Sequence, residues 1–141
     1  MRTNNKFRAV IVAAMVICLL AANLSASAAE DTPIQPRLTG VSDMQVDLDI
    51  TSAGRADCYS RVALKSGYTG TLTMELKCSS NRILWDSEKT WSTSGSGTLT
   101  LDKSYYVSSD NYYYVVATVD VYNAAGTFVE TVSLESSIYS Y

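Results

Sequence analysis

The sequence contains no histidine among its 141 residues. Histidine is the usual proton shuttle of enzymes and the commonest metal ligand, so the most frequent routes to acid–base and metal-assisted catalysis are missing. The sequence also lacks the motifs that pair a nucleophilic serine with a base. A pair of carboxylates could still hydrolyse a glycoside, but a chain this small rarely forms the deep cleft that such an enzyme needs. We therefore expect no enzymatic activity and no cofactor.

The first 28 residues have the layout of a secretory signal peptide. Positive charges come first, at Arg2, Lys6 and Arg8, and an uncharged apolar run follows over residues 9–22. Small side chains at Ala26 and Ala28 match the A-x-A cleavage pattern, which places the cut after Ala28. We expect a helical signal peptide over residues 1–28. The mature chain would then be extracellular and would meet the membrane only during export.

Two other interpretations of this segment fit less well. A transmembrane helix needs about 20 apolar residues, and the uncharged run ends at Ala22, before that length is reached. A lipoprotein anchor at Cys18 would need small residues before it, but Met15, Val16 and Ile17 precede it.

The mature chain that this cleavage would leave is acidic. It would carry eight basic and fourteen acidic residues, a net charge of −6. This charge repels a phosphate backbone, so nucleic acids and anionic membranes are poor partners. The charge mainly predicts a soluble protein, and we expect a monomer.

Cysteine is scarce as well, and the mature chain keeps only Cys58 and Cys78. In an oxidising compartment an even pair indicates a disulfide. Both residues fall on the apolar phase of their predicted strands, so a Cys58–Cys78 bridge would lie in the core. The alternative is two free thiols, one of them a nucleophile, but no histidine is present to activate it.

Apolar and polar residues alternate along most of the remaining chain, as in half-buried strands. Seven strands are expected, at residues 44–51, 58–65, 71–78, 83–85, 98–102, 111–122 and 127–134. Residues 92–97 are rich in serine and glycine and are expected to form a loop. This spacing is typical of an antiparallel, immunoglobulin-like β-sandwich, which we assign to residues 43–141. Residues 29–42 contain both prolines and are expected to form an extended linker.

A tyrosine near the start of the sixth strand supports this architecture. In immunoglobulin-type sandwiches such a tyrosine fixes the corner that precedes the strand. Tyr113 stands two residues before the inward Val115, with Asp110 just upstream. Because no cysteine occupies position 115, the usual bridge between the second and sixth strands is absent.

The region from Ala56 to Glu130 also resembles a group of small secreted immunoglobulin-like proteins of Gram-positive bacteria. The resemblance rests on the Gly67-Tyr68-x-Gly70 turn, on Trp85 with Trp91, and on Lys103-x-Tyr105-Tyr106-Val107 leading to Tyr112-Tyr113-Tyr114-Val115. The group has no established activity, so the resemblance implies the compartment and the fold but no mechanism.

Aromatic side chains form the candidate binding surface. On the long sixth strand, Tyr112, Tyr114 and Tyr122 are expected to face outward, and Trp91 is expected to be exposed beside the Ser/Gly loop. Trp85 is expected to lie in the core. Exposed aromatic rings can stack on sugars or contact proteins. Alternatively, tyrosine is simply a good strand residue that half-covers a sheet.

Acidic pairs could bind calcium at loop ends, as in some extracellular modules. Asp47 with Asp49, and Asp102 with Asp110, are the candidates, but no calcium-loop pattern surrounds them. A solvated polar face is the simpler interpretation, and we expect no metal site.

The leading hypothesis is therefore a non-catalytic extracellular module that binds a protein or a surface glycan through exposed tyrosines. The alternatives are a structural or self-assembling envelope component, held together by free strand edges, and a secreted inhibitor or toxin-like effector.

Overall fold

The structure, a computed structural model, describes residues 38–141, which form eight strands and no helix. The strands are β1 (Val41–Ile50), β2 (Arg55–Leu64), β3 (Tyr68–Ser79), β4 (Asp86–Ser96), β5 (Thr98–Tyr106), β6 (Tyr112–Asn123), β7 (Phe128–Glu135) and β8 (Tyr139–Ser140). The predicted signal peptide and most of the predicted linker lie outside the described residues.

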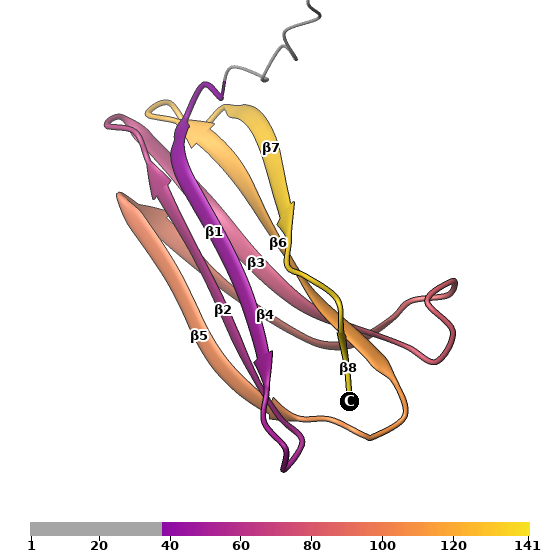
Figure 1. Cartoon of the computed structure of the whole chain (residues 1–141). Coiled ribbons are helices and arrows are strands. Elements are labelled where there is room, and N and C mark those ends of the chain that lie inside the picture. Colours follow the sequence, from indigo (N-terminus) through magenta and orange to yellow (C-terminus); the bar gives the residue numbers. More distant parts are fainter. Residues whose placement is uncertain (1–37) are drawn as a thin grey trace, which may run out of the picture. The chain divides into compact units, whose positions relative to one another are not determined.

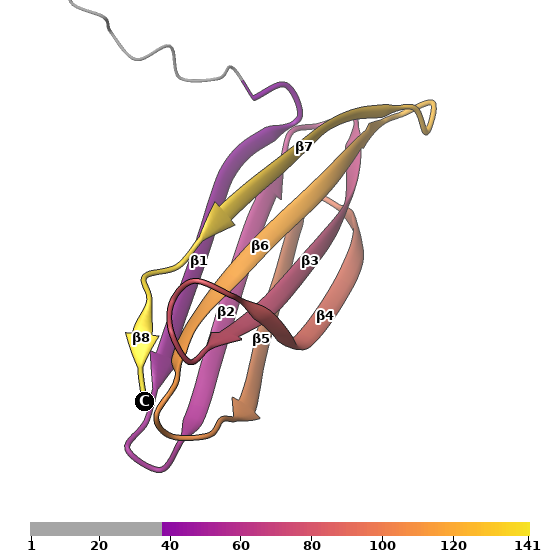
Figure 2. The same cartoon turned by 90° about the vertical axis from the view of Figure 1, so that its right-hand side faces the viewer.

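Two antiparallel sheets pack against each other (Figures 1 and 2). One sheet has the order β1-β2-β5, and the other has the order β4-β3-β6-β7, with the short β8 also pairing with β6. The predicted all-β class and the predicted antiparallel arrangement are confirmed.

The core lies between the sheets and follows the predicted alternation. Every second residue of β2 is buried from Ala56 to Leu64, and every second residue of β6 is buried from Tyr113 to Val121. Leu72, Met74 and Leu76 of β3 complete the layer on the β6 side and are fully buried. Burying a large apolar side chain contributes about 1.5–3 kcal/mol, so this layer is the main source of stability.

Tyr113 fixes the connection that precedes β6, as predicted. Its ring is 1% exposed, and its hydroxyl donates a 2.8 Å hydrogen bond to the carbonyl of Ser108. Burial, followed by the neighbouring Cys78, raises the pKa of Tyr113 to about 12. The bond holds the segment between β5 and β6 against the end of the sandwich.

The prediction for the middle of the chain was wrong in two places. Ile83–Trp85 is not a strand but part of the loop between β3 and β4. Ser92–Ser96, expected to be a loop, belongs to β4, where Ser92 pairs with Thr73 of β3. The serines and glycines of β4 carry no alternating apolar signal, and pairing with β3 decides their conformation instead.

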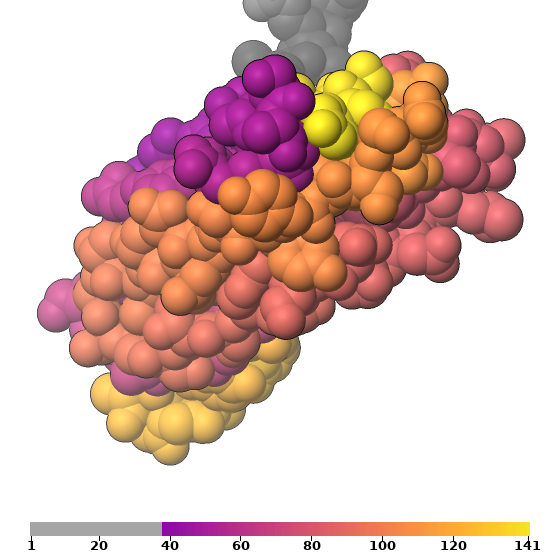
Figure 3. All heavy atoms as spheres, turned by 90° about the horizontal axis from the view of Figure 1, so that it is seen from below, coloured from indigo at the N-terminus to yellow at the C-terminus, as the bar shows by residue number. Residues whose placement is uncertain are grey.

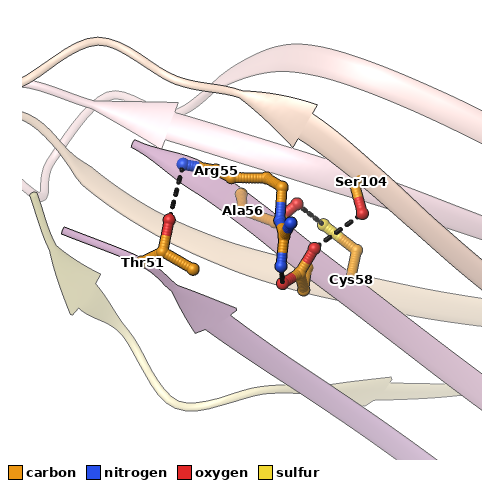
Figure 4. Close-up of polar contacts among 6 residues, drawn as sticks. Thr51, Arg55, Ala56, Cys58 and Ser104 are labelled. Carbon is orange, nitrogen blue, oxygen red and sulfur yellow. Dashed lines mark hydrogen bonds and ion pairs between the residues drawn. The ribbon is translucent and has the colours of Figure 1, made fainter. Parts of the chain in front are cut away.

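The predicted Cys58–Cys78 disulfide is also absent, and both cysteines are free thiols. Cys58 is buried in β2, with its Sγ 4.0 Å from the carbonyl oxygen of Ala56 (Figure 4). Cys78 lies in the other sheet, near the end of β3 and opposite Tyr113.

A difference in level along the strands explains the missing bridge. Cys58 lies six residues before β2 ends at Leu64, whereas Cys78 lies ten residues after β3 begins at Tyr68. The offset of four residues corresponds to about 13 Å along extended strands. Bridged cysteines have Cα atoms within about 7 Å of each other. The apolar phase of both residues was predicted correctly, but the phase of a strand does not specify how far along the sandwich each residue lies.

The C-terminal residues close one end of the sandwich, beside the turn between β1 and β2 (Figure 3). The backbone of Tyr141 exchanges two hydrogen bonds with Asn111, and its hydroxyl donates to the carbonyl of Ser52 at 3.4 Å. Gly54 of that turn has φ 78°, and a Cβ there would lie 2.9 Å from the Tyr141 ring. Glycine is therefore required at position 54 for both conformation and space.

At the opposite end, Glu130 of β7 holds the backbone that leads into β1. Its carboxylate accepts hydrogen bonds from the N–H groups of Thr39 and Gly40, at 3.0 and 2.7 Å. Lys65 adds a 2.6 Å bond from its Nζ to the carbonyl of Leu38. The entry of the chain into β1 is thus fixed from two sides.

Candidate functional site

Three of the predicted surface residues lie on the outer face of β6, and they fall into two separate places. Tyr112 and Tyr114 are neighbours at the start of the strand, and both are half-buried. Tyr122 lies near the other end, where its ring meets that of Phe128 at a centroid distance of 5.9 Å. Ten residues of strand separate Tyr122 from Tyr112, about 33 Å, so the three tyrosines do not form one patch.

The expectations for the two tryptophans were wrong: Trp91, expected to be exposed, faces the core, and Trp85, expected in the core, lies on the surface. Trp91 of β4 stands directly opposite the buried Met74 and packs against the core. Directly opposite residues on paired strands point to the same face, so Trp91 faces inward. Trp85 lies in the loop after β3, and its ring contacts the outward Tyr114. Trp85, rather than Trp91, belongs to the aromatic surface.

The segment from Ser80 to Trp85, called here the β3–β4 loop, projects beside the sheet (Figures 1 and 2). Two side chains organise its backbone. The Ser79 Oγ accepts hydrogen bonds from the N–H groups of Asn81 and Arg82, at 3.3 and 2.9 Å. The Asn81 Oδ1 accepts bonds from the N–H groups of Ile83 and Leu84, at 2.9 and 3.1 Å.

Arg82 takes the left-handed backbone conformation that this arrangement requires, with φ 61°. Non-glycine residues rarely adopt it, because it carries a steric cost. The four hydrogen bonds that Ser79 and Asn81 accept offset this cost, so the loop has a defined conformation.

Two tyrosines on the outer face of β6, Tyr112 and Tyr114, pack against the loop. The Arg82 guanidinium lies over the ring of Tyr112, with its Cζ 4.1 Å from the ring centroid. The Trp85 ring meets the Tyr114 ring at 90°, with centroids 4.5 Å apart. Both geometries are favourable, the first as a cation–π contact and the second as an edge-to-face aromatic pair. Tyr112 and Tyr114 therefore act as a platform for the loop.

Between these two contacts the loop presents an apolar tip, formed by Ile83 and Leu84. Their side chains are 78% and 73% exposed, the largest values among the big hydrophobic residues that the structure describes. Single exposed apolar residues are ordinary, but two adjacent ones on a fixed loop are not explained by packing.

A shallow cleft of about 390 Å³ lies on the Trp85 side of the loop. It is lined by Trp85, Tyr114, Glu135, Ser136, Ser137 and Ile138. Ser136 fixes the wall opposite the loop, because its Oγ accepts a bond from the N–H of Val115 and its N–H donates to the carbonyl of Val115. A second cleft, on the Ser80 side, is lined by Ser80, Asp110, Asn111, Tyr112, Ser140 and Tyr141.

Glu135 and Asp110 are the acidic side chains that line these two clefts. Glu135 makes no side-chain hydrogen bond or ion pair within residues 38–141. In the same range no three His, Cys, Asp or Glu residues come together to hold a metal ion.

The thiol of Cys58 in β2 lines neither cleft. Burial raises the pKa of Cys58 to about 12, with a smaller contribution from Asp57, so its thiol stays protonated at neutral pH.

Sequence reasoning missed the loop and the Glu135–Ile138 wall. The pattern Ser79-x-Asn81 was available as a signal, since serine and asparagine side chains bond to backbone N–H groups a few residues ahead. The apolar Ile83-Leu84-Trp85 run favoured a strand instead and concealed the turn.

Comparison of the sequence with protein-family models and with curated proteins finds no match. Within residues 38–141 there is no helix of the length and hydrophobicity needed to cross a membrane.

Proposed function

We propose that this chain is a secreted, non-catalytic protein with an immunoglobulin-like sandwich, which docks onto a partner protein through its β3–β4 loop. The observation that carries the proposal is the exposed pair Ile83 and Leu84 on a loop fixed by hydrogen bonds. Contiguous exposed apolar surface often marks an interaction site. A loop already fixed in its binding conformation loses little entropy on association, which favours affinity.

Two further features support the secreted, immunoglobulin-like character. The charge pattern of residues 1–28 is typical of an exported chain. The strand orders β1-β2-β5 and β4-β3-β6-β7, together with the bond from Tyr113 to Ser108, are compatible with an immunoglobulin-type arrangement.

A protein is the favoured partner for the tip because of its chemistry. Ile83 and Leu84 offer no hydrogen-bonding side-chain group, so the tip matches an apolar pocket better than a hydroxyl-rich glycan. The flanking Arg82 is held over Tyr112 and adds one positive charge at the margin of the tip. Arginine and aromatic residues are enriched among the residues that dominate interface energies.

The test is binding of fluorescently labelled protein to the cells that produce it, before and after treatment of those cells with protease. Wild-type protein is expected to bind saturably, and protease treatment is expected to abolish binding. The double variant Ile83→Ser/Leu84→Ser is expected to bind at least about tenfold more weakly.

The matched control is Tyr106→Ser, on β5 of the other sheet, because Tyr106 is 72% exposed. It is expected to bind like wild type. Equal binding by the tip variant, or binding that survives protease, would overturn the proposal. Because both tip residues are exposed, the substitutions are expected to change the free energy of unfolding by no more than about 0.5 kcal/mol.

A further inference from the structure

We infer that the cleft between the β3–β4 loop and residues 135–138 binds a neutral sugar ring. The cleft contains neither residue of the apolar tip and shares only Trp85 with the β3–β4 loop, so it provides a site beyond the proposed docking of a protein. Its volume of about 390 Å³ lies at the lower end of the usual range for small-ligand sites, about 300–1,000 Å³.

The walls combine the two chemistries that a sugar ring presents. Trp85 and Tyr114 stand at 90° and, with Ile138, form apolar surface for the C–H face of the ring. The exposed carboxylate of Glu135 and the exposed hydroxyl of Ser137 lie on the facing wall and are free to bond to ring hydroxyls. A carboxylate forms hydrogen bonds roughly twice as strong as a neutral acceptor does.

Both walls are held in place before any ligand arrives. Trp85 follows the four hydrogen bonds made by Ser79 and Asn81, and its ring rests on Tyr114. The opposite wall is held by the two bonds between Ser136 and Val115, and the Ser136 hydroxyl also donates to the carbonyl of Ser137. A site fixed in this way loses little entropy when a ligand binds.

The charge at the cleft selects against acidic ligands. Glu135 repels an acidic sugar, and the acidic composition of the chain adds to that repulsion. Arg82 lies over Tyr112 and does not line the cleft, so Glu135 is the one charged side chain in its walls. A hydroxyl-rich ring with one apolar face and no acidic group fits these walls.

The test is a titration of the purified protein with neutral di- and trisaccharides built from hexoses and N-acetylhexosamines, followed by tryptophan fluorescence. A uronic-acid disaccharide serves as the charged comparison. At least one neutral saccharide is expected to bind saturably, with a dissociation constant on the order of 1 mM. The uronic-acid disaccharide is expected to bind at least about tenfold more weakly.

Substitutions then locate the site. Glu135→Gln removes the charge without disturbing the packing and is expected to weaken binding about tenfold, and Tyr114→Ala is expected to do the same. Tyr122→Ala is the matched control, since it changes a tyrosine on the same face of the same strand, and it is expected to bind like wild type.

Three results would overturn the inference. One is the absence of saturable binding of any neutral saccharide up to about 10 mM. Another is preference for the acidic sugar, and the third is an equal loss of affinity in Tyr122→Ala and Glu135→Gln. The tip variant Ile83→Ser/Leu84→Ser leaves the cleft polar groups intact and is expected to bind the saccharide normally, so protein docking and sugar binding can fail independently.

Discussion

The ring of Trp85 meets the ring of Tyr114 at a right angle, with centroids 4.5 Å apart. This contact joins a loop that sequence patterning interpreted as a strand to a tyrosine that it interpreted as a free binding residue. Together with the contact between Arg82 and Tyr112, it gives the outer face of β6 a supporting function: the tyrosines hold the loop, and the loop presents Ile83 and Leu84.

Removing the platform should therefore release the loop. Tyr114→Ala is expected to lower the free energy of unfolding by about 0.5–1.5 kcal/mol and to shift Trp85 fluorescence to longer wavelength, because the indole loses its partner. Urea unfolding and emission spectra measure both effects. Tyr122→Ala serves as the control, and an equal spectral shift in that variant would contradict the assignment.

The loop should also be rigid on the fast timescale. The N–H groups of Ile83 and Leu84 are bonded to Asn81, so their NMR order parameters are expected near 0.85, as in the strands. Asn81→Ala removes the acceptor and should lower these values. Wild-type order parameters below about 0.6 at both positions would show that the loop is not preorganised.

Ser60 and Ser79, the buried serines within residues 38–141, are predicted to respond to substitution in opposite ways. The Ser60 Oγ is buried without a hydrogen-bond partner, so Ser60→Ala is expected to leave stability unchanged or to raise it by up to about 1 kcal/mol. The Ser79 Oγ accepts two loop N–H groups, so Ser79→Ala is expected to cost about 1–3 kcal/mol. Urea unfolding of both variants makes the comparison, and a loss at Ser60 as large as that at Ser79 would contradict it.

The thiol of Cys58 makes stability depend on alkaline pH. Burial raises its pKa from 9.0 to about 12, so the folded state retains a proton that the unfolded state loses first. The corresponding stability is fully present below about pH 9 and declines as the pH rises towards 12. Between pH 7 and pH 10.5 the free energy of unfolding should decrease more in wild type than in Cys58→Ala. Equal decreases in the two proteins would refute this contribution.

The free thiols can also be counted. Alkylation of the denatured protein, without any reductant, is expected to modify both Cys58 and Cys78. In the native protein Cys58 should stay protected, because it is fully buried. Mass spectrometry after each treatment reports the number, and an unmodified pair in the denatured sample would show that a bridge had formed after all.

Periodicity predicted the sandwich because its strands are half-buried. The alternation along β2 and β6 was strong enough to place Val62 and Val115 on the core side, and the Tyr113 corner was recognisable from its position before β6. β4 was not predictable in this way, because its serines, threonines and glycines take their conformation from pairing with β3.

The candidate site was predicted less well, for reasons of geometry in three dimensions. The outward phase of Tyr112 and Tyr114 was predicted correctly. The residues that contact their rings, Arg82 and Trp85, come from a loop whose conformation depends on hydrogen bonds accepted by the side chains of Ser79 and Asn81. The other wall, around Glu135, reaches the site only because β7 pairs with β6. Neither relationship leaves a periodic signal in the sequence.

Site-specific cross-linking from the tip of the loop tests most directly whether the β3–β4 loop docks onto a protein. A photoreactive benzoylphenylalanine would replace Leu84 in one sample and Tyr106, which is comparably exposed, in another, and both would be irradiated on the surface of the producing cells. One discrete protein adduct is expected from position 84. Excess wild-type protein should suppress that adduct, whereas the Ile83→Ser/Leu84→Ser variant should not. The same adducts from positions 84 and 106, or equal suppression by the tip variant, would contradict docking through the loop.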